Sequence, residues 1–176
     1  MTPPPQAREL GWAAVYTRLC ATLSKLALML AVVGLIAVVL CVQWQVFGRY
    51  VLNDTPTWAE ALAMLLVLFV TALGLAVGVR DAGHVGLESM VVLLPERWQR
   101  RIECLIHLLV GLFGALMVHG GWIWAAAKWG EKKPMLPVPD GIDYVPLIIA
   151  GVLIVLFSIE HLLANLRGQV VEPAWN

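Results

Sequence analysis

The sequence predicts an all-α integral membrane protein with four transmembrane helices, and two observations carry this prediction. Hydrophobic residues make up 60% of the chain and charged residues only 14%, which is far more apolar than a water-soluble domain. The apolar residues gather in runs that are long enough to cross a bilayer core as helices. These runs cover about residues 26–48, 58–79, 104–127 and 144–166. We therefore expect one membrane domain over residues 1–176.

Residues 1–25 are expected to form an amphipathic arm that lies on the membrane surface before the first span. Arg18, Thr22 and Lys25 fall on one face of this segment. Apolar and aromatic residues recur on another face at three- and four-residue spacing: Trp12, Val15, Tyr16, Leu19, Leu23 and Leu26. The alternative is a simple extension of the first span. The long lead before the apolar run differs from a secretory signal peptide, so the first span is expected to remain uncleaved.

The second apolar run has one charged residue at each end. Thr57 and Glu60 match the T-x-x-E capping box at a helix start, which gives Glu60 a structural role beside the positive end of the helix dipole. A helix from Trp58 to Val79 is about 33 Å long. We therefore expect Glu60 and Arg80 at the two water-facing ends of this span.

Prolines mark the starts of the last two helices. Pro95 followed by Glu96 predicts that the third helix begins before its apolar part, and Pro146 suits the first turn of the fourth. Residues 128–143 are expected to form a loop. Leu87 to Leu94 is apolar but too short to span, so it is interpreted as a membrane-surface segment.

The distribution of basic residues favours both termini in the cytoplasm. Four spans put both termini on one side, and that side would hold eight basic residues against four on the other. The eight are Arg8, Arg18, Lys25, Arg80, Arg97, Arg100, Arg101 and Arg167, and the four are Arg49, Lys128, Lys132 and Lys133.

Two small-residue pairs are candidates for close helix contacts. Gly74 and Gly78 form a GxxxG motif in the second span, and Gly111 and Ala115 form a similar pair in the third. The cysteines form no CxxC motif and are expected to be small buried hydrophobic residues. Balanced charge, with twelve basic and twelve acidic residues, gives no reason to expect nucleic acid as a partner.

Ionisable residues inside a membrane call for a functional hypothesis. Those in or beside the apolar runs are Glu60, His107, His119, Glu160 and His161. Glu160 could pair with a basic residue of another helix or subunit. A b-type haem would need histidines at matching depth on facing helices, but His107 and His119 are about 18 Å apart along one helix. A redox anchor subunit is therefore the weaker alternative.

No HExxH, Walker or GxSxG motif occurs, and no zinc-type Cys/His cluster. We therefore expect no catalytic, cofactor or metal site, and the protein is not expected to be an enzyme.

Three stretches carry a family resemblance. Arg49 to Glu60 reads R-Y-V-L-N-D-T-P-T-W-A-E, and the second span ends L-G-L-A-V-G-V-R before D-A-G-H-V-G-L-E. Pro134 to Gly151 reads P-M-L-P-V-P-D-G-I-D-Y-V-P-L-I-I-A-G. Together they resemble the small membrane subunit, DctQ type, of tripartite ATP-independent periplasmic (TRAP) transporters. Ala61 and Met64 depart from the family pattern, which often has an acid and an arginine there.

The resemblance implies a multi-pass protein of the bacterial inner membrane that contacts membrane lipid and pairs with a large, many-span permease subunit. That partner would bind an organic acid, such as a C4-dicarboxylate or a sugar acid, and move it with a sodium gradient. A periplasmic substrate-binding protein would deliver the acid. The candidate subunit-interface or helix-end residues are Arg49, Trp58, Glu60, Gly74, Gly78, Arg80, Gly83, His84 and Glu160.

Overall fold

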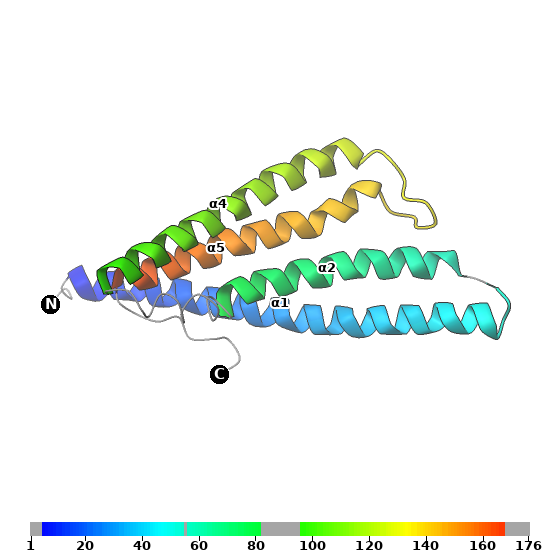
Figure 1. Cartoon of the computed structure of the whole chain (residues 1–176), viewed down its shortest axis with the longest axis horizontal. Helices are drawn as coiled ribbons and strands as arrows, with labels where there is room; N and C mark the ends of the chain where they lie inside the picture. The colour runs from blue at the N-terminus through cyan, green and yellow to red at the C-terminus, as the bar shows by residue number, and fades with distance from the viewer. Residues whose placement is uncertain (1–4, 55, 82–95, 168–176) are drawn as a thin grey trace.

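The structure is a computed structural model of the chain, and it describes residues 5–54, 56–81 and 96–167. Within these ranges, four helices are long and apolar enough to cross a membrane, which confirms the predicted fold class. The helices are α1 (Pro5–Tyr50), α2 (Thr57–Asp81), α4 (Glu96–Lys128) and α5 (Val145–Arg167), and a short 3₁₀ helix, η1 (Asp140–Tyr144), precedes α5 (Figure 1).

The helix starts follow the prolines as predicted. The third helix begins at Glu96, and Pro146 lies in the first turn of α5. The expected loop after α4 is ordered by backbone hydrogen bonds from Asp140 N to Glu131 O (2.8 Å) and from Lys133 N to Val138 O (3.0 Å). Its last residues form η1. The predicted surface segment Leu87–Leu94 lies outside the described residues.

The first helix is longer than its membrane part. It runs without a break for 46 residues from Pro5 to Tyr50, about 69 Å at the usual rise per residue. The expected arm is thus continuous with the first span rather than a separate element. Its location on a membrane surface remains a prediction.

A repeating seam joins α1 to α2 as an antiparallel hairpin. Buried and half-buried positions of α1 recur in alternating steps of four and three residues, as in a coiled coil. They are Cys20, Ser24, Ala27, Ala31, Gly34, Val38, Cys41, Gln45 and Gly48. A Cβ on Gly34 would lie 2.7 Å from Cγ2 of Val70, so the two helices pack closely near their middles.

This seam corrects the expected face of the arm. Tyr16, which the spacing places in the membrane-facing row, points into the bundle and donates a hydrogen bond to the carbonyl oxygen of Leu156 (2.8 Å). Leu23 also packs against the core. Val15 and Leu19 remain exposed, and so do Arg18, Thr22 and Lys25 on the polar face.

Glycines form the contact between α4 and α5. A Cβ on Gly151 would lie 2.7 Å from the carbonyl oxygen of Gly114, and one on Gly114 would lie 2.9 Å from Ile154. The predicted Gly111 also belongs to this seam, since its Cβ would lie 3.3 Å from Ser158. Its partner in the sequence motif, Ala115, is exposed. The close contact therefore follows Gly111, Gly114 and Gly121 instead.

The GxxxG motif of α2 is not a helix contact within the described chain. A Cβ built on Gly74 or Gly78 meets nothing within 4 Å, and both residues are exposed. The reason is rotational: the buried seam of α2 runs through Ala63, Val70 and Val77, and the glycines lie on a different side of the helix. This side of α2 therefore has no partner helix among the described residues.

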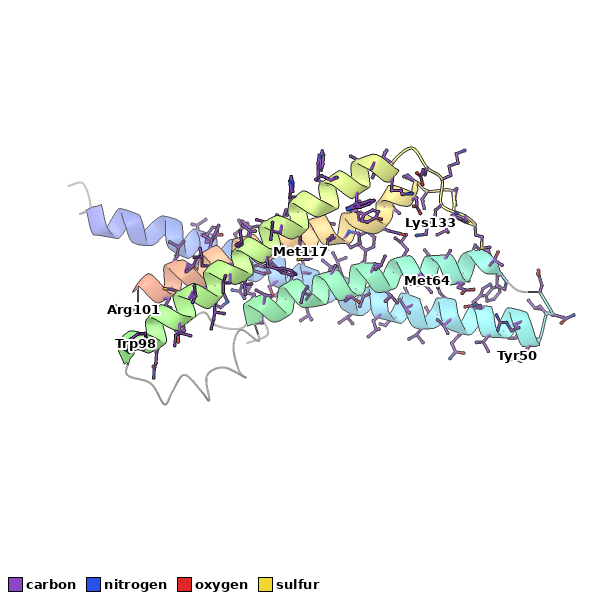
Figure 2. The ribbon with its side chains drawn as sticks, turned by 45° about the horizontal axis from the view of Figure 1, so that its top comes forward. Tyr50, Met64, Trp98, Arg101, Met117 and Lys133 are labelled. Carbon is purple, nitrogen blue, oxygen red and sulfur yellow. The ribbon has the colours of Figure 1, made fainter. Side chains whose placement is uncertain are left out.

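The two hairpins meet through α2 and α5, and α1 and α4 lie at the outer edges (Figure 1). Phe157 and Ile154 of α5 pack with Ala76 and Val77 of α2 in the shared core. The start of α1 and the end of α5 lie at the same end of the bundle. Figure 2 places Tyr50 and Lys133 at the opposite end, which we call the loop end.

Candidate functional site

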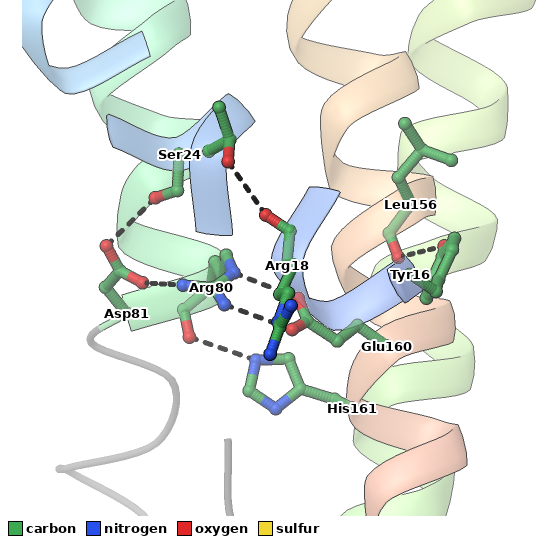
Figure 3. A network of polar contacts seen from close by, with 9 residues as sticks. Tyr16, Arg18, Ser24, Arg80, Asp81, Leu156, Glu160 and His161 are labelled. Carbon is green, nitrogen blue, oxygen red and sulfur yellow. Dashed lines mark hydrogen bonds and ion pairs between the residues drawn. The ribbon is translucent and has the colours of Figure 1, made fainter. Parts of the chain in front are cut away.

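A buried group of charged side chains joins the two hairpins at the end of α2 (Figure 3). Arg80 Nε and Nη2 donate to the two carboxylate oxygens of Glu160 (2.9 and 3.0 Å), and Arg80 Nη1 donates to Asp81 Oδ1 (2.7 Å). The other oxygen of Asp81 accepts a hydrogen bond from Ser24 Oγ (2.9 Å). We call Ser24, Arg80, Asp81 and Glu160 the inter-hairpin ion cluster. It connects α1, α2 and α5.

Local sequence explains why these side chains point inward. Arg80 continues the seam of α2 three residues after Val77, and Ser24 continues the seam of α1 four residues after Cys20. Glu160 is three residues after Phe157 on the buried face of α5. Each of these polar residues therefore occupies the next core position of its helix, close to the end of the apolar stretch.

The geometry of the ion pair favours a structural role. The fork of a guanidinium matches the two oxygens of a carboxylate, and two parallel bonds fix the relative rotation of both helices. The side chains of Arg80, Asp81 and Glu160 are each about 1% exposed. A buried charge without its partner is costly, so the cluster disfavours any docking of the hairpins that separates Arg80 from Glu160.

Two histidines extend the cluster toward α4. The Nε2 of His161 lies 3.0 Å from the carbonyl oxygen of Arg80, so this nitrogen carries the proton and donates. The His161 ring stacks on that of His107, with centroids 4.5 Å apart and planes 8° from parallel. Parallel ring faces are not the arrangement of two axial haem ligands, which bind iron through ring nitrogens. His119 is exposed on α4, so the three histidines that the structure describes are not arranged as a haem site would require.

Of the seven candidate site residues that the structure describes, it brings two into direct contact, namely Arg80 and Glu160. The hypothesis that Glu160 pairs with a basic residue of another helix is confirmed. The expectation of a water-facing Arg80 is wrong, because this residue is only 2% exposed. The bidentate partner on α5 compensates for the loss of water around its charge.

The other candidates lie apart from the cluster. Glu60 lies in the first turn of α2 at the loop end, where its carboxylate accepts a hydrogen bond from Gln45 (3.3 Å). Thr57 is itself the first residue of that helix. Arg49 and Trp58 are exposed near the same end. Gly83 and His84 lie outside the described residues.

Sequence reasoning missed Ser24 and Asp81. A signal for Ser24 was present in the row of small residues Cys20, Ser24, Ala27 and Ala31, whose heptad spacing is typical of a close helix seam. Asp81 carried no such signal. Its neighbour Arg80 could equally have faced water. Only the position of α5 decides that the side chains of Arg80 and Asp81 point into the bundle.

Comparison with known proteins adds a family to this geometry. A family model described as tripartite ATP-independent periplasmic transporters, DctQ component, matches residues 38–168. A Haemophilus influenzae protein named as a TRAP transporter small permease protein is 24% identical over 126 residues, which are 69% of this chain and 78% of that protein. The range matched by the family model includes Arg80, Asp81 and Glu160, while Ser24 precedes it.

Two similar proteins are named for sialic acid transport. The sialic acid TRAP transporter small permease protein SiaQ of Vibrio cholerae is 33% identical over 92 residues, 50% of this chain and 52% of that protein. The sialic acid TRAP transporter permease protein SiaT of Haemophilus influenzae is 34% identical over 77 residues, 44% of this chain. These residues are only 12% of SiaT, so the similar segment lies within a much longer protein.

Proposed function

Since the chain belongs to the DctQ component family of tripartite ATP-independent periplasmic transporters, we propose that this small permease subunit braces a large transport subunit. It is a multi-pass protein of the bacterial inner membrane, with four spanning helices among its described residues. In this role it binds its partner and holds it in the bilayer. It carries out no catalytic step of its own.

The inter-hairpin ion cluster is the observation that best supports bracing. Its three charged side chains pair with one another inside the chain, and they hold both hairpins in one relative orientation. A rigid two-hairpin unit is suited to supporting a partner that changes conformation during transport. Charges that pair this closely serve packing rather than the transient binding of an anion.

The length of SiaT supports a large permease as the partner. In that relative, a segment similar to this chain is part of a single, much longer permease protein. Two parts of one chain stay in permanent contact. Where the same two parts are separate chains, they must bind each other to stay together. We infer that this chain associates with a large, many-span permease in the same way.

The transported compound is proposed to be an organic acid. The large subunit would bind the acid and move it with a sodium gradient, after a periplasmic binding protein has delivered it. The names of two relatives include sialic acid, which is a sugar acid. A C4-dicarboxylate remains the other proposed substrate class.

The exposed face of α2 is the proposed contact for the large subunit. Because Gly74 and Gly78 have no side chains, the backbone of a partner helix can approach this face closely. Replacing Gly78 with leucine should leave the fold intact, because nothing lies within 4 Å of its Cβ position. The substitution should, however, weaken copurification with the large subunit. Gly151 is unsuitable for this test because its substitution disturbs the α4–α5 seam.

Reconstitution tests the proposed function. Proteoliposomes would contain the chain alone, its large permease partner alone, or both. Each preparation would receive the binding protein, a labelled organic acid and an imposed sodium gradient. We expect uptake only where both membrane subunits are present. Uptake by the small chain alone, or full uptake without it, would refute the bracing role.

A further inference from the structure

Side-chain contacts place specific residues of α1 and α4 level with the end of α2. Ser24 bonds to Asp81 (2.9 Å), so this part of α1 lies beside the end of α2. On the other edge, His107 of α4 stacks on His161, which contacts the Arg80 carbonyl. Ser24 and His107 therefore mark the same level, close to the ion cluster, on opposite sides of the bundle.

Exposed basic residues lie at and just beyond this level on both edges. Lys25 follows Ser24 directly, and Arg18 lies six residues earlier, about 9 Å further along α1. Arg101 lies six residues before His107, again about 9 Å further out along α4. All three side chains are exposed. We call Arg18, Lys25 and Arg101 the basic girdle.

Among the described side chains at this end, no exposed carboxylate balances the girdle. Among the described side chains at this end, Asp81 and Glu160 are buried in the ion cluster. Glu103 is half-buried and accepts a hydrogen bond from Asn165 (3.0 Å). The loop end differs, because exposed acids such as Asp54 and Glu131 accompany its basic residues there.

The neighbours of the girdle are apolar and aromatic. Val15, Leu19 and Leu26 of α1 are more than half exposed, and Trp98 of α4 is 56% exposed. The guanidinium of Arg101 lies 5.8 Å from the Trp98 ring centroid, and both residues are at the start of α4 in Figure 2. Basic side chains with tryptophan and aliphatic residues at one depth are typical of the boundary between hydrocarbon and headgroups.

We propose that the basic girdle binds the phosphate groups of anionic phospholipids around this end of the bundle. Its residues lie on both outer edges at matching depth, and a lipid annulus reaches both edges at once. A protein partner with an acidic face would cover one edge and leave the other without a ligand. The proposal stands independently of any role in transport.

Native mass spectrometry of the full-length chain in zwitterionic detergent tests the proposal. The chain is titrated with dioleoylphosphatidylglycerol and, separately, with dioleoylphosphatidylcholine. We expect tighter binding of phosphatidylglycerol. Each of Arg18→Gln, Lys25→Gln and Arg101→Gln should reduce this preference about fivefold, as expected for about 1 kcal/mol per basic residue at an anionic surface. Phosphatidylglycerol should raise the thermal unfolding temperature of the chain at low salt. In about 1 M salt, where charges are strongly screened, this stabilisation should be lost.

Matched variants decide the outcome. Arg49→Gln with Lys132→Gln removes exposed basic residues from the loop end and should leave the preference unchanged. Arg18→Lys with Arg101→Lys keeps the charge and should also retain it. Equal binding of both lipids by the unmodified chain would overturn the proposal, and so would an equal loss in the loop-end variant. Girdle variants that keep the lipid preference but lose copurification with a large permease would assign the surface to a protein instead.

Discussion

The two seams that involve α5 are built on opposite principles. On one side, α5 meets α4 through glycines, and a Cβ on Gly151 would lie only 2.7 Å from the backbone of Gly114. On the other side, α5 meets α2 through the two parallel hydrogen bonds from Arg80 to Glu160. The first contact forms because glycine has no side chain to keep the helices apart. The second forms because two charged side chains bind each other.

This difference predicts how each seam fails. Adding atoms should damage the glycine seam, because the helix backbones already touch and must move apart. Removing atoms should damage the ionic seam, because the remaining partner is left buried and charged. The same helix can therefore be loosened from either neighbour by opposite kinds of substitution.

The largest expected effect is at the ion cluster. Arg80→Ala should destabilise the chain by about 3–5 kcal/mol, because Glu160 loses both bidentate bonds while still buried. The measurement is the free energy of unfolding by SDS titration in mixed micelles. The triple substitution Arg80→Met, Asp81→Asn and Glu160→Met should recover much of this loss, since it removes all three buried charges together. A single variant as stable as the unmodified chain would show that the pair is not needed for docking.

A smaller effect is expected at the glycine seam. Gly151→Ala should destabilise the chain by about 1–3 kcal/mol in the same titration, because the new methyl group meets the backbone of α4. Gly74→Ala is the matched control. Its position is open, so alanine should be neutral or should stabilise the helix by up to about 1 kcal/mol. Equal losses in both variants would mean that the seams do not differ in the way described.

The smallest effects should come from single hydrogen bonds of α1. Tyr16→Phe removes the bond to the Leu156 carbonyl, and Ser24→Ala removes the bond to Asp81. Tyr16→Phe should cost about 0.6 kcal/mol, the average for hydrogen bonds between membrane helices. Ser24→Ala should cost about twice as much, because its acceptor is a charged carboxylate. A loss of several kcal/mol for Ser24→Ala would show instead that Asp81 depends on this one donor. Circular dichroism provides the control that helix content is unchanged.

Much of the fold could be predicted because membrane helices are recognisable from short stretches of sequence. Apolar runs of sufficient length identified four spans, and the prolines at 95 and 146 marked two helix starts close to the observed Glu96 and Val145. The charge bias gave an orientation, with both termini in the cytoplasm, which remains a prediction. These features depend only on neighbouring residues and on the bilayer.

The contacts between helices could be predicted only in part. Pairing of Glu160 with a basic residue was one hypothesis, because an isolated charge in an apolar helix is costly. Which residue would serve was undetermined, since Arg80 is eighty positions away and lay at a plausible water-facing end. The GxxxG motif at Gly74 was open to the same ambiguity: a small residue permits a close contact without specifying a partner.

By itself, then, the sequence determined the four apolar spans, the starts of two helices and the resemblance to a transporter subunit. Only the tertiary structure decided which faces meet. It turned Arg80 inward, placed Gly114 against Gly151, and left Gly74 and Gly78 on an open surface. The physical reason is that hydrophobicity acts residue by residue, whereas pairing depends on the rotation and register of helices that are distant in the chain.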